Sequence, residues 1–353
     1  MMEWVFERMI YVKEACKLVS EGIEGERASI CFPLEYKTAV LVYELSKYCD
    51  LKVCRFDDPT TKIEAVRWLE DKGVKVRRKE ECLDSEYFLD CVAALTRKTL
   101  KAGKSVTGVI ELTKSGVDRL KSLHAKKVFR KAISIDDSEL KGKGENIYGT
   151  GLGLLDALIR LNIMLPGKNV FIIGFGRVGE GCASVLKKLG CEVEVFDKDK
   201  LRCALAEYMG FKVSEVEDGL READIVVTAT GVDGIIDSSN IRYLKNGAIL
   251  CNMGAGRYEI DLRNLEGYQR TEIGDHITKL SGLNYFYLLA DGRSVNLTMG
   301  NGTPLEIMDR TFALVAFALE HLIKKDFSGI IETPKEVEER LAELVRLKKI
   351  QKR

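Results

Sequence analysis

The chain has 353 residues, 46% of them hydrophobic, which is enough material for about two packed domains. Lys and Arg (55) nearly balance Asp and Glu (54), so net charge gives no reason to expect a nucleic acid or an anionic membrane as a partner. No apolar run approaches the ~20 residues of a membrane span, and the amino terminus lacks the basic start and cleavage site of a signal peptide. We therefore expect a cytoplasmic protein.

In the amino-terminal half, strand-like and helix-like patterns alternate along the chain. Short apolar runs at 28–32 and 52–56 predict strands, and helical spacing of apolar residues follows each of them, at 38–48 and 62–72. A third strand is expected from residue 74. This alternation predicts a parallel sheet that is covered by helices.

A cluster of glycines between residues 142 and 153 marks the passage to a second strand–helix series. The fold class that we predict is α/β, with two Rossmann-like doubly wound parallel-sheet domains separated by a cleft. A helix near 304–325 is apolar on more than one face, so we expect it in a core or a subunit interface. The predicted domains are 1–149 together with 304–325, then 150–303, and a C-terminal helical tail at 326–353.

The strongest motif is the glycine-rich turn that follows a predicted strand at 168–173. Gly174 permits a tight turn, Gly176 lets the backbone approach a pyrophosphate, and Gly179 lets the following helix pack closely on the strand. The helix amino terminus offers free N–H groups to the phosphates. The spacing predicts a dinucleotide site that also includes Arg177 and Val178.

Further polar residues stand at the ends of neighbouring predicted strands. Asp197 ends the strand 192–196, about twenty residues after the glycines, where a carboxylate bonds the ribose hydroxyls of NAD and repels the 2′-phosphate of NADP. Ligands in doubly wound sheets bind beyond the carboxyl ends of strands. The same argument adds these candidate cofactor-binding residues: Thr228, Thr230, Gly231 and Asn252.

The cysteines and histidines give little material for a metal site. There are ten cysteines without a Cys-x-x-Cys pair and three histidines, so we predict no bound metal. Cys91 leaves two alternatives open. Its thiol would act as a base or nucleophile if its pKa were lowered, whereas its apolar neighbours, including Leu89 and Val92, favour an inert role.

Several motifs together resemble the S-adenosylhomocysteine hydrolase family. The resemblance is close from 146 through the glycine-rich turn, at 228–231 and 251–254, and at 288–297, and it is looser over the amino-terminal half. It implies a tightly bound NAD that oxidises the ribose 3′-hydroxyl, after which the thiol is eliminated, water adds and the ketone is reduced again. It also implies that the cofactor is bound by Asn296, Thr113 and Ser115.

The resemblance further assigns a catalytic triplet. Lys141 stands where the family has the lysine that contacts the hydroxyl being oxidised, Glu145 replaces a partnering aspartate, and Asn146 matches a family asparagine. From the residues alone, Lys141 would be taken for a solvated lysine in a glycine-rich loop.

Other positions depart from the family pattern. Pro33 replaces a pocket histidine and Lys37 replaces an adenine-binding acid, so we expect a substrate other than S-adenosylhomocysteine. Lys37 and Lys114 would add positive charge and favour an acidic, nucleoside-like ligand, unless both lysines extend to solvent. His276, in a predicted loop, is a weaker candidate for the site. The substrate-binding candidates are Glu35, Lys37, Asp90 and Lys114.

Three functions follow as hypotheses. The chain is an NAD-dependent enzyme of this type with an altered substrate, a simple NAD-dependent dehydrogenase, or a regulatory protein that binds NAD without chemistry. The resemblance also implies a homodimer or homotetramer.

Overall fold

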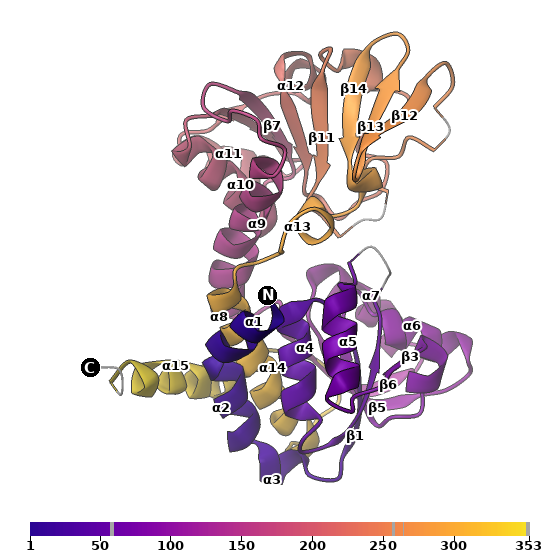
Figure 1. The fold of residues 1–353 in the computed structure, drawn as a ribbon, viewed down its shortest axis with the longest axis vertical. Helices are drawn as coiled ribbons and strands as arrows, with labels where there is room; N and C mark the ends of the chain where they lie inside the picture. The colour runs from indigo at the N-terminus through magenta and orange to yellow at the C-terminus, as the bar shows by residue number, and fades with distance from the viewer. Residues whose placement is uncertain (57–59, 256–257, 264, 351–353) are drawn as a thin grey trace. The chain divides into compact units, whose positions relative to one another are not determined.

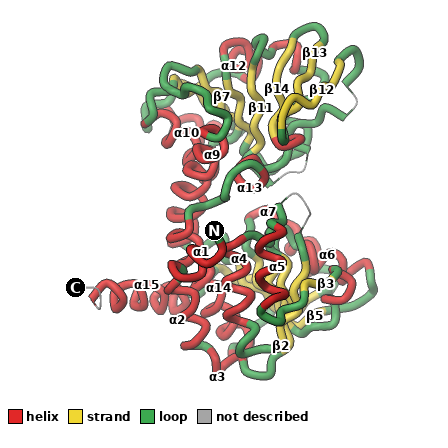
Figure 2. Tube along the Cα trace, viewed as in Figure 1, coloured by secondary structure: helices red, strands yellow, loops and turns green. Residues whose placement is uncertain are grey.

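The computed structural model describes residues 1–56, 60–255, 258–263 and 265–350, and it forms two compact units (Figure 1). The first unit contains 1–142 and 305–353, and the second contains 143–304. Each unit is built on its own sheet, with helices on both sides (Figure 2). The fold is therefore α/β with two Rossmann-like sheets. Within the described residues, no helix is long and apolar enough to cross a membrane.

The first unit has a parallel sheet in the order β15-β6-β5-β4-β1-β2-β3. Strand order reverses between β1 and β4, which creates the switch point where such sheets bind ligands. Its strands are β1 (Arg27–Cys31), β2 (Asp50–Cys54), β3 (Val76–Arg77), β4 (Tyr87–Asp90), β5 (Val106–Glu111), β6 (Phe129–Ser134) and β15 (Gly329–Glu332). Its helices are α1 (Met2–Arg8), α2 (Ile10–Leu18), α3 (Ser20–Ile23), α4 (Tyr36–Leu45), α5 (Ile63–Asp71), α6 (Ala94–Lys101), α7 (Lys114–His124), α8 (Glu139–Lys141), α14 (Leu305–Lys324) and α15 (Lys335–Ile350).

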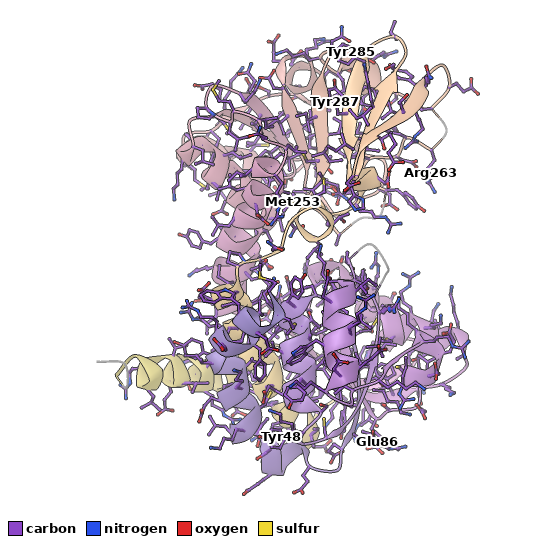
Figure 3. All side chains as sticks on the ribbon, in the orientation of Figure 1. Tyr48, Glu86, Met253, Arg263, Tyr285 and Tyr287 are labelled. Atoms are coloured by element: carbon purple, nitrogen blue, oxygen red, sulfur yellow. The ribbon has the colours of Figure 1, made fainter. Side chains whose placement is uncertain are left out.

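The second unit has the strand order β12-β13-β14-β11-β10-β7-β8-β9, parallel except where the hairpin β12–β13 joins β14. On β14, Tyr285 and Tyr287 pack edge to face with ring centroids 6.2 Å apart (Figure 3). The strands are β7 (Asn169–Ile173), β8 (Glu192–Phe196), β9 (Lys212–Val213), β10 (Ile225–Thr228), β11 (Ala248–Asn252), β12 (Gln269–Gly274), β13 (Ile277–Ser281) and β14 (Tyr285–Leu289). The helices are α9 (Thr150–Ile159), α10 (Arg177–Lys188), α11 (Lys200–Tyr208), α12 (Val216–Glu222) and α13 (Val295–Thr298), preceded by a π-helical segment at Gly142–Gly149.

The carboxyl-terminal segment differs from the helical tail expected at 326–353. Residues 329–332 form β15, which pairs in parallel with β6, so that Ile330 lies opposite Ala132. The helix α15 then packs Val337 and Leu341 into the core of the first unit. A short apolar run beside an open sheet edge gains backbone hydrogen bonds by joining the sheet. The spacing of apolar residues along the chain does not report this pairing with a distant strand.

The helix α14 lies in the core of the first unit, as its apolar faces predicted. Its side chains from Phe312 to Leu319 are buried, and it packs against α2. Asp309 is also buried there, and its carboxylate accepts the N–H groups of Tyr11 (3.0 Å) and Val12 (2.8 Å) in the first turn of α2. Burial raises the pKa of Asp309 to about 6.

This pKa predicts a pH-dependent stability. Asp309 binds a proton more tightly in the folded protein than in the unfolded chain, where its pKa is 3.8. Its contribution to the free energy of unfolding is therefore complete at low pH and is lost as pH rises through about 6. The loss is at most about 3 kcal/mol. Urea unfolding of the wild type and of Asp309→Asn, at several pH values, measures it. The free energy of unfolding of the wild type, relative to the variant, should fall as pH rises from about 4 to about 6; a difference that does not vary with pH contradicts the assignment.

Candidate functional site

The glycine-rich turn of the second unit has the backbone that a dinucleotide requires. Gly174 has φ +100°, and a Cβ there would lie 2.7 Å from the carbonyl oxygen of Ala229. A Cβ on Gly179 would lie 1.8 Å from the carbonyl oxygen of Gly174, so only glycine allows α10 to approach β7 this closely. A Cβ on Gly176 would meet its nearest atom, a guanidinium nitrogen of Arg202, at 3.8 Å. Open space in front of Gly176, at the start of α10, fits a pyrophosphate.

Asp197 follows β8 and is tied to this turn. One carboxylate oxygen accepts the N–H of Phe175 at 2.7 Å, and the other accepts the N–H of Asp199 at 2.9 Å. Asp197 is half-buried at the carboxyl end of β8, where a ribose diol would bind. Arg177 is exposed and Val178 is half-buried in the first turn of α10.

Asn252 joins the ends of β10 and β11. Its side-chain oxygen accepts from the N–H of Gly254 (2.8 Å) and the hydroxyl of Thr228 (3.2 Å), while its amide donates to the carbonyl oxygen of Gly292 (2.9 Å). Asn296 is buried on α13. A Cβ placed on Gly153 of α9 would lie 3.0 Å from the Cβ of Asn296. The cofactor candidates at these strand ends are therefore held by one another and by backbone groups.

In the first unit, Lys141 is buried and paired. Its ammonium nitrogen lies 3.5 Å from a carboxylate oxygen of Asp136, and both side chains are less than a tenth exposed. Asp136 follows the carboxyl end of β6, and Lys141 ends the short helix α8. The structure thus places Lys141 at the carboxyl edge of the sheet. It is not a solvated loop lysine.

A buried pair of acids lies at the same edge, on β4 and β5. Asp90 and Glu111 are opposite each other in the parallel register. Asp90 accepts the N–H groups of Leu95 (3.0 Å) and Thr96 (2.9 Å), so it caps the amino terminus of α6. Burial raises the pKa of both acids. The pKa of Glu111 rises to about 8, and the charge of Asp90 is the second cause of that rise. Asp90, a substrate candidate from the sequence, is engaged by the backbone of α6.

Glu111 holds the strained turn that follows β4. Val92 and Ala93 have φ near +58° and +53°, which residues with a side chain rarely adopt. The Glu111 carboxylate accepts both of their N–H groups at 2.9 Å. It also accepts the hydroxyl of Thr113 at 2.7 Å, while Thr113 caps α7 through the N–H of Gly116. Sequence reasoning did not identify Glu111 as a site residue, because Val92 and Ala93 lie 18–19 residues away from it in the chain.

Cys91 lies beside these charged groups. Burial raises the pKa of its thiol well above the ordinary value, and the charges of Glu111 and Asp90 add to the rise, whereas Lys141 acts in the opposite direction. A protonated, buried thiol is a poor nucleophile. The structure therefore favours the inert role for Cys91.

Comparison with known proteins agrees with this arrangement. Residues 146–302 match the family model described as "S-adenosyl-L-homocysteine hydrolase, NAD binding domain". The chain is 33% identical to S-inosyl-L-homocysteine hydrolase of Methanopyrus kandleri, over 98% of this chain and 88% of that protein. The chain belongs to the S-adenosyl-L-homocysteine hydrolase family. It is also 31% identical to adenosylhomocysteinase of Thermotoga maritima, over 97% of this chain and 92% of that protein.

The family assignment gives the cofactor, which is NAD. The open space at Gly176, the amino terminus of α10 and the carboxylate of Asp197 fit it. A buried residue that sequence reasoning left out supports this site. Glu259 accepts the N–H (2.9 Å) and hydroxyl (2.9 Å) of Thr230 and the N–H of Gly231 (2.8 Å). The sequence did not show this contact, because Glu259 stands 28–29 residues after the turn.

Relative to the family pattern, Lys37 is the clearest change in the first unit. Its ammonium lies 2.9 Å from a carboxylate oxygen of Glu35, and both side chains are buried. Glu35 also caps α4 by accepting the N–H groups of Lys37 (3.1 Å) and Thr38 (3.3 Å). This pair follows β1, at the switch point of the sheet.

The expectation of two pocket lysines needs correction. Lys114 lies on α7 with 60% of its side chain exposed, 3.5 Å from Asp118 one turn later. Lys37 is buried, but Glu35 balances its charge. The excess positive charge that favoured an acidic ligand is therefore not present at these residues.

The remaining candidates are placed as follows. Glu145 and Asn146 lie in the π-helical segment Gly142–Gly149, with Asn146 buried. Ser115 lies on α7, and its hydroxyl is buried without a hydrogen-bond partner in the described part of the chain. His276 is exposed in the β12–β13 turn, with its carbonyl oxygen accepting the N–H of Ala290 at 2.8 Å. Among the described residues, no cluster of His, Cys, Asp or Glu forms a metal site.

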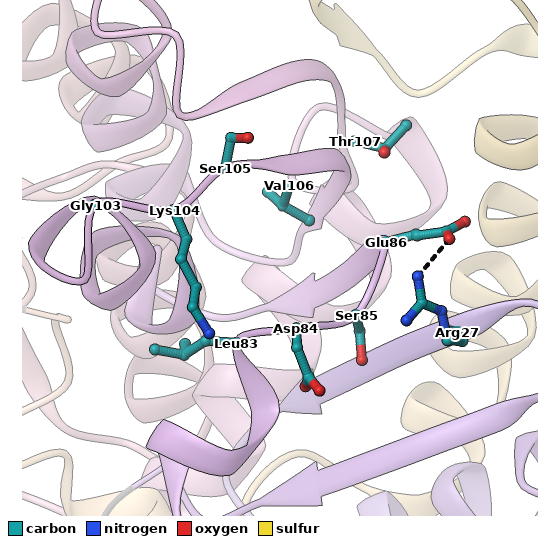
Figure 4. A pocket seen from close by; sticks show the side chains of 10 residues that line it. All are labelled: Arg27, Leu83, Asp84, Ser85, Glu86, Gly103, Lys104, Ser105, Val106 and Thr107. Carbon is teal, nitrogen blue, oxygen red and sulfur yellow. Dashed lines mark hydrogen bonds and ion pairs between the residues drawn. The ribbon is translucent and has the colours of Figure 1, made fainter.

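A pocket of about 420 Å³ lies at the opposite, amino edge of the first sheet (Figure 4). It is lined by residues that include Arg27 and Glu86, which pair at 2.7 Å, and by Asp84 and Lys104. These residues precede or begin β1, β4 and β5, whereas ligands of doubly wound sheets bind at the carboxyl edge. This pocket is therefore not part of the candidate active site.

Proposed function

We propose that this chain is an NAD-dependent enzyme that oxidises a ribose-type hydroxyl of a substrate other than S-adenosyl-L-homocysteine. The observation that carries the proposal is the buried Lys141–Asp136 pair at the carboxyl edge of the first sheet. Burying a lysine is costly unless it is paired, and a buried, paired lysine at the ligand-binding edge of a sheet is a candidate functional group. Lys141, Glu145 and Asn146 are the proposed catalytic residues.

Bound NAD supplies the acceptor for the hydrogen that leaves the ribose carbon. Lys141 would take the hydroxyl proton as a neutral amine, after its ammonium has passed a proton to Asp136, and Asp136 would hold the lysine nitrogen in place. The reaction also requires the nicotinamide to reach the ribose. Glu259 and Asn252 would keep the turns after β10 and β11 in the shape that the nicotinamide half of the cofactor needs.

The Glu35–Lys37 pair supports a neutral nucleoside thioether, because the charges at this site balance. The Lys37 ammonium would offer a donor, and the Glu35 carboxylate an acceptor, to an oxygen and its neighbouring N–H on a purine. The relative from Methanopyrus kandleri is named S-inosyl-L-homocysteine hydrolase. S-inosyl-L-homocysteine is therefore the first substrate that we propose.

Thiol release tests the proposal. The protein, supplied with NAD, is incubated with S-inosyl- or S-adenosyl-L-homocysteine, and new thiol is measured against a protein blank that accounts for its cysteines. We expect release from the inosyl compound to be at least about tenfold faster, a difference of about 1.4 kcal/mol. Equal or faster release from the adenosyl compound contradicts the proposed substrate. Accumulating NADH without thiol indicates a simple dehydrogenase, and bound NAD without either product indicates a binding protein.

A further inference from the structure

The carboxyl-terminal helix contacts the turn that carries Lys141. On α15, one carboxylate oxygen of Glu338 accepts the hydroxyl of Ser138 in a short hydrogen bond, and it accepts the N–H of Leu140 at 3.3 Å. The same Ser138 oxygen accepts the N–H of Lys141 at 3.2 Å. A chain of hydrogen bonds therefore runs from Glu338 through Ser138 to the backbone of Lys141.

This chain of contacts is anchored by the end of the first sheet. β15 pairs with β6 up to Glu332 opposite Ser134, and the Thr333 hydroxyl donates to the carbonyl oxygen of Ser134 at 2.6 Å. Val337, next to Glu338, is buried in the core. The start of α15 is thus fixed against the strand that leads to Asp136 and Lys141.

The helix α8 needs such support because it spans only Glu139–Lys141. A helix of one turn has almost no stability of its own. The Ser138 hydroxyl can rotate, and donating its proton to Glu338 turns an oxygen lone pair toward the N–H of Lys141. Without the carboxylate, that hydroxyl has no fixed direction and the Leu140 N–H loses its acceptor.

We propose that Glu338 is a positioning residue, which acts through Ser138 to hold Lys141 in place for the reaction. The inference rests on the proposed function, in which Lys141 is catalytic. It assigns the start of α15 a part in the active site although α15 lies some two hundred residues further along the chain.

The test compares Glu338→Ala with Glu339→Ala, a change at an exposed residue whose carboxylate lies 3.4 Å from Lys335 one turn earlier on the same helix. Amide hydrogen exchange of the peptide 136–142 reports on the turn without any substrate. We expect exchange there to accelerate about tenfold in Glu338→Ala and to stay unchanged in Glu339→Ala. Turnover should fall about tenfold to a hundredfold, mainly in kcat, with KM changed less than about threefold.

Two further variants show whether the effect passes through Ser138. Glu338→Gln keeps an acceptor oxygen and should recover most of the protection and turnover. Ser138→Ala should give most of the loss seen in Glu338→Ala, since only the contact of Glu338 with the Leu140 N–H remains, and the double variant should be no worse than Glu338→Ala. Additive losses would overturn the route through Ser138. Wild-type exchange at 136–142 in Glu338→Ala would overturn the proposal itself.

Failure of the proposed function gives a different pattern. If the wild type turns over no substrate while Glu338→Ala still accelerates exchange, the contact orders the turn but the catalytic part of the proposal is wrong. Circular dichroism of each variant at the assay temperature identifies global unfolding, and in that case Glu338→Gln decides between the outcomes.

Discussion

Replacing Lys141 with methionine is expected to lower kcat about a thousandfold while NAD stays bound. Methionine keeps much of the volume of the buried side chain but supplies no group that binds or deprotonates a hydroxyl, a loss that typically costs 10²–10⁴-fold, roughly. Lys141 is buried against Asp136, and the glycine-rich turn that we expect to bind the pyrophosphate belongs to the other unit, so cofactor affinity should change little. Steady-state thiol release and a titration with NAD measure the two effects.

The matched control is Lys114→Met, a lysine that is 60% exposed on α7. Turnover by Lys114→Met should remain within about twofold of the wild type, since exposed ion pairs contribute little to stability. Removing Lys141 also takes a partner from buried Asp136, which lowers the free energy of unfolding by about 3 kcal/mol. The assays are therefore run well below the temperature at which the variant unfolds. Full turnover by Lys141→Met would favour a protein that binds NAD without using this lysine.

The second large effect is expected at the glycine-rich turn, where two alanine substitutions should behave differently. In Gly179→Ala the new methyl group would lie 1.8 Å from a backbone oxygen, so α10 must move away from β7. We expect a loss of about 3 kcal/mol in the free energy of unfolding, together with the loss of NAD binding. In Gly176→Ala the nearest atom is 3.8 Å away, so stability should change by less than about 0.5 kcal/mol.

The two variants therefore separate folding from binding. Gly176→Ala should weaken NAD about tenfold to a hundredfold, because its methyl group occupies the space that the pyrophosphate needs. Urea unfolding of the apoproteins and calorimetric titration with NAD give both quantities. Wild-type affinity in Gly176→Ala would show that the cofactor does not approach this part of the turn.

The cofactor half of the protein is readable from sequence because its signals are local. Gly174, Gly176 and Gly179 stand at fixed spacing between a strand and a helix, and Asp197 ends the next strand. The strands expected at 28–32 and 52–56 also appear, as β1 and β2. The periodicity of apolar residues and the spacing of glycines predict such features, because residues close in sequence determine them.

Features set by contacts between distant residues were not predicted. Glu259 reaches the turn after β10 from 28–29 residues away, and Glu111 meets Val92 through the neighbouring strand. For the same reason the charge of Lys37 was overestimated, because a sequence does not show that Glu35 pairs with it in a buried site. β15 was missed because only its partner β6 makes it a strand.

The central claim, that this chain uses bound NAD to oxidise a ribose-type hydroxyl, is tested most directly by the absorbance of the nicotinamide. NAD-loaded protein is mixed with S-inosyl-L-homocysteine or inosine in equal amounts, with 3′-deoxyinosine as the control that has no hydroxyl to oxidise. We predict reduced nicotinamide that stays with the protein through desalting, and none with the control. An unchanged spectrum with these ligands, and with S-adenosyl-L-homocysteine and adenosine, while NAD remains bound, would contradict the account.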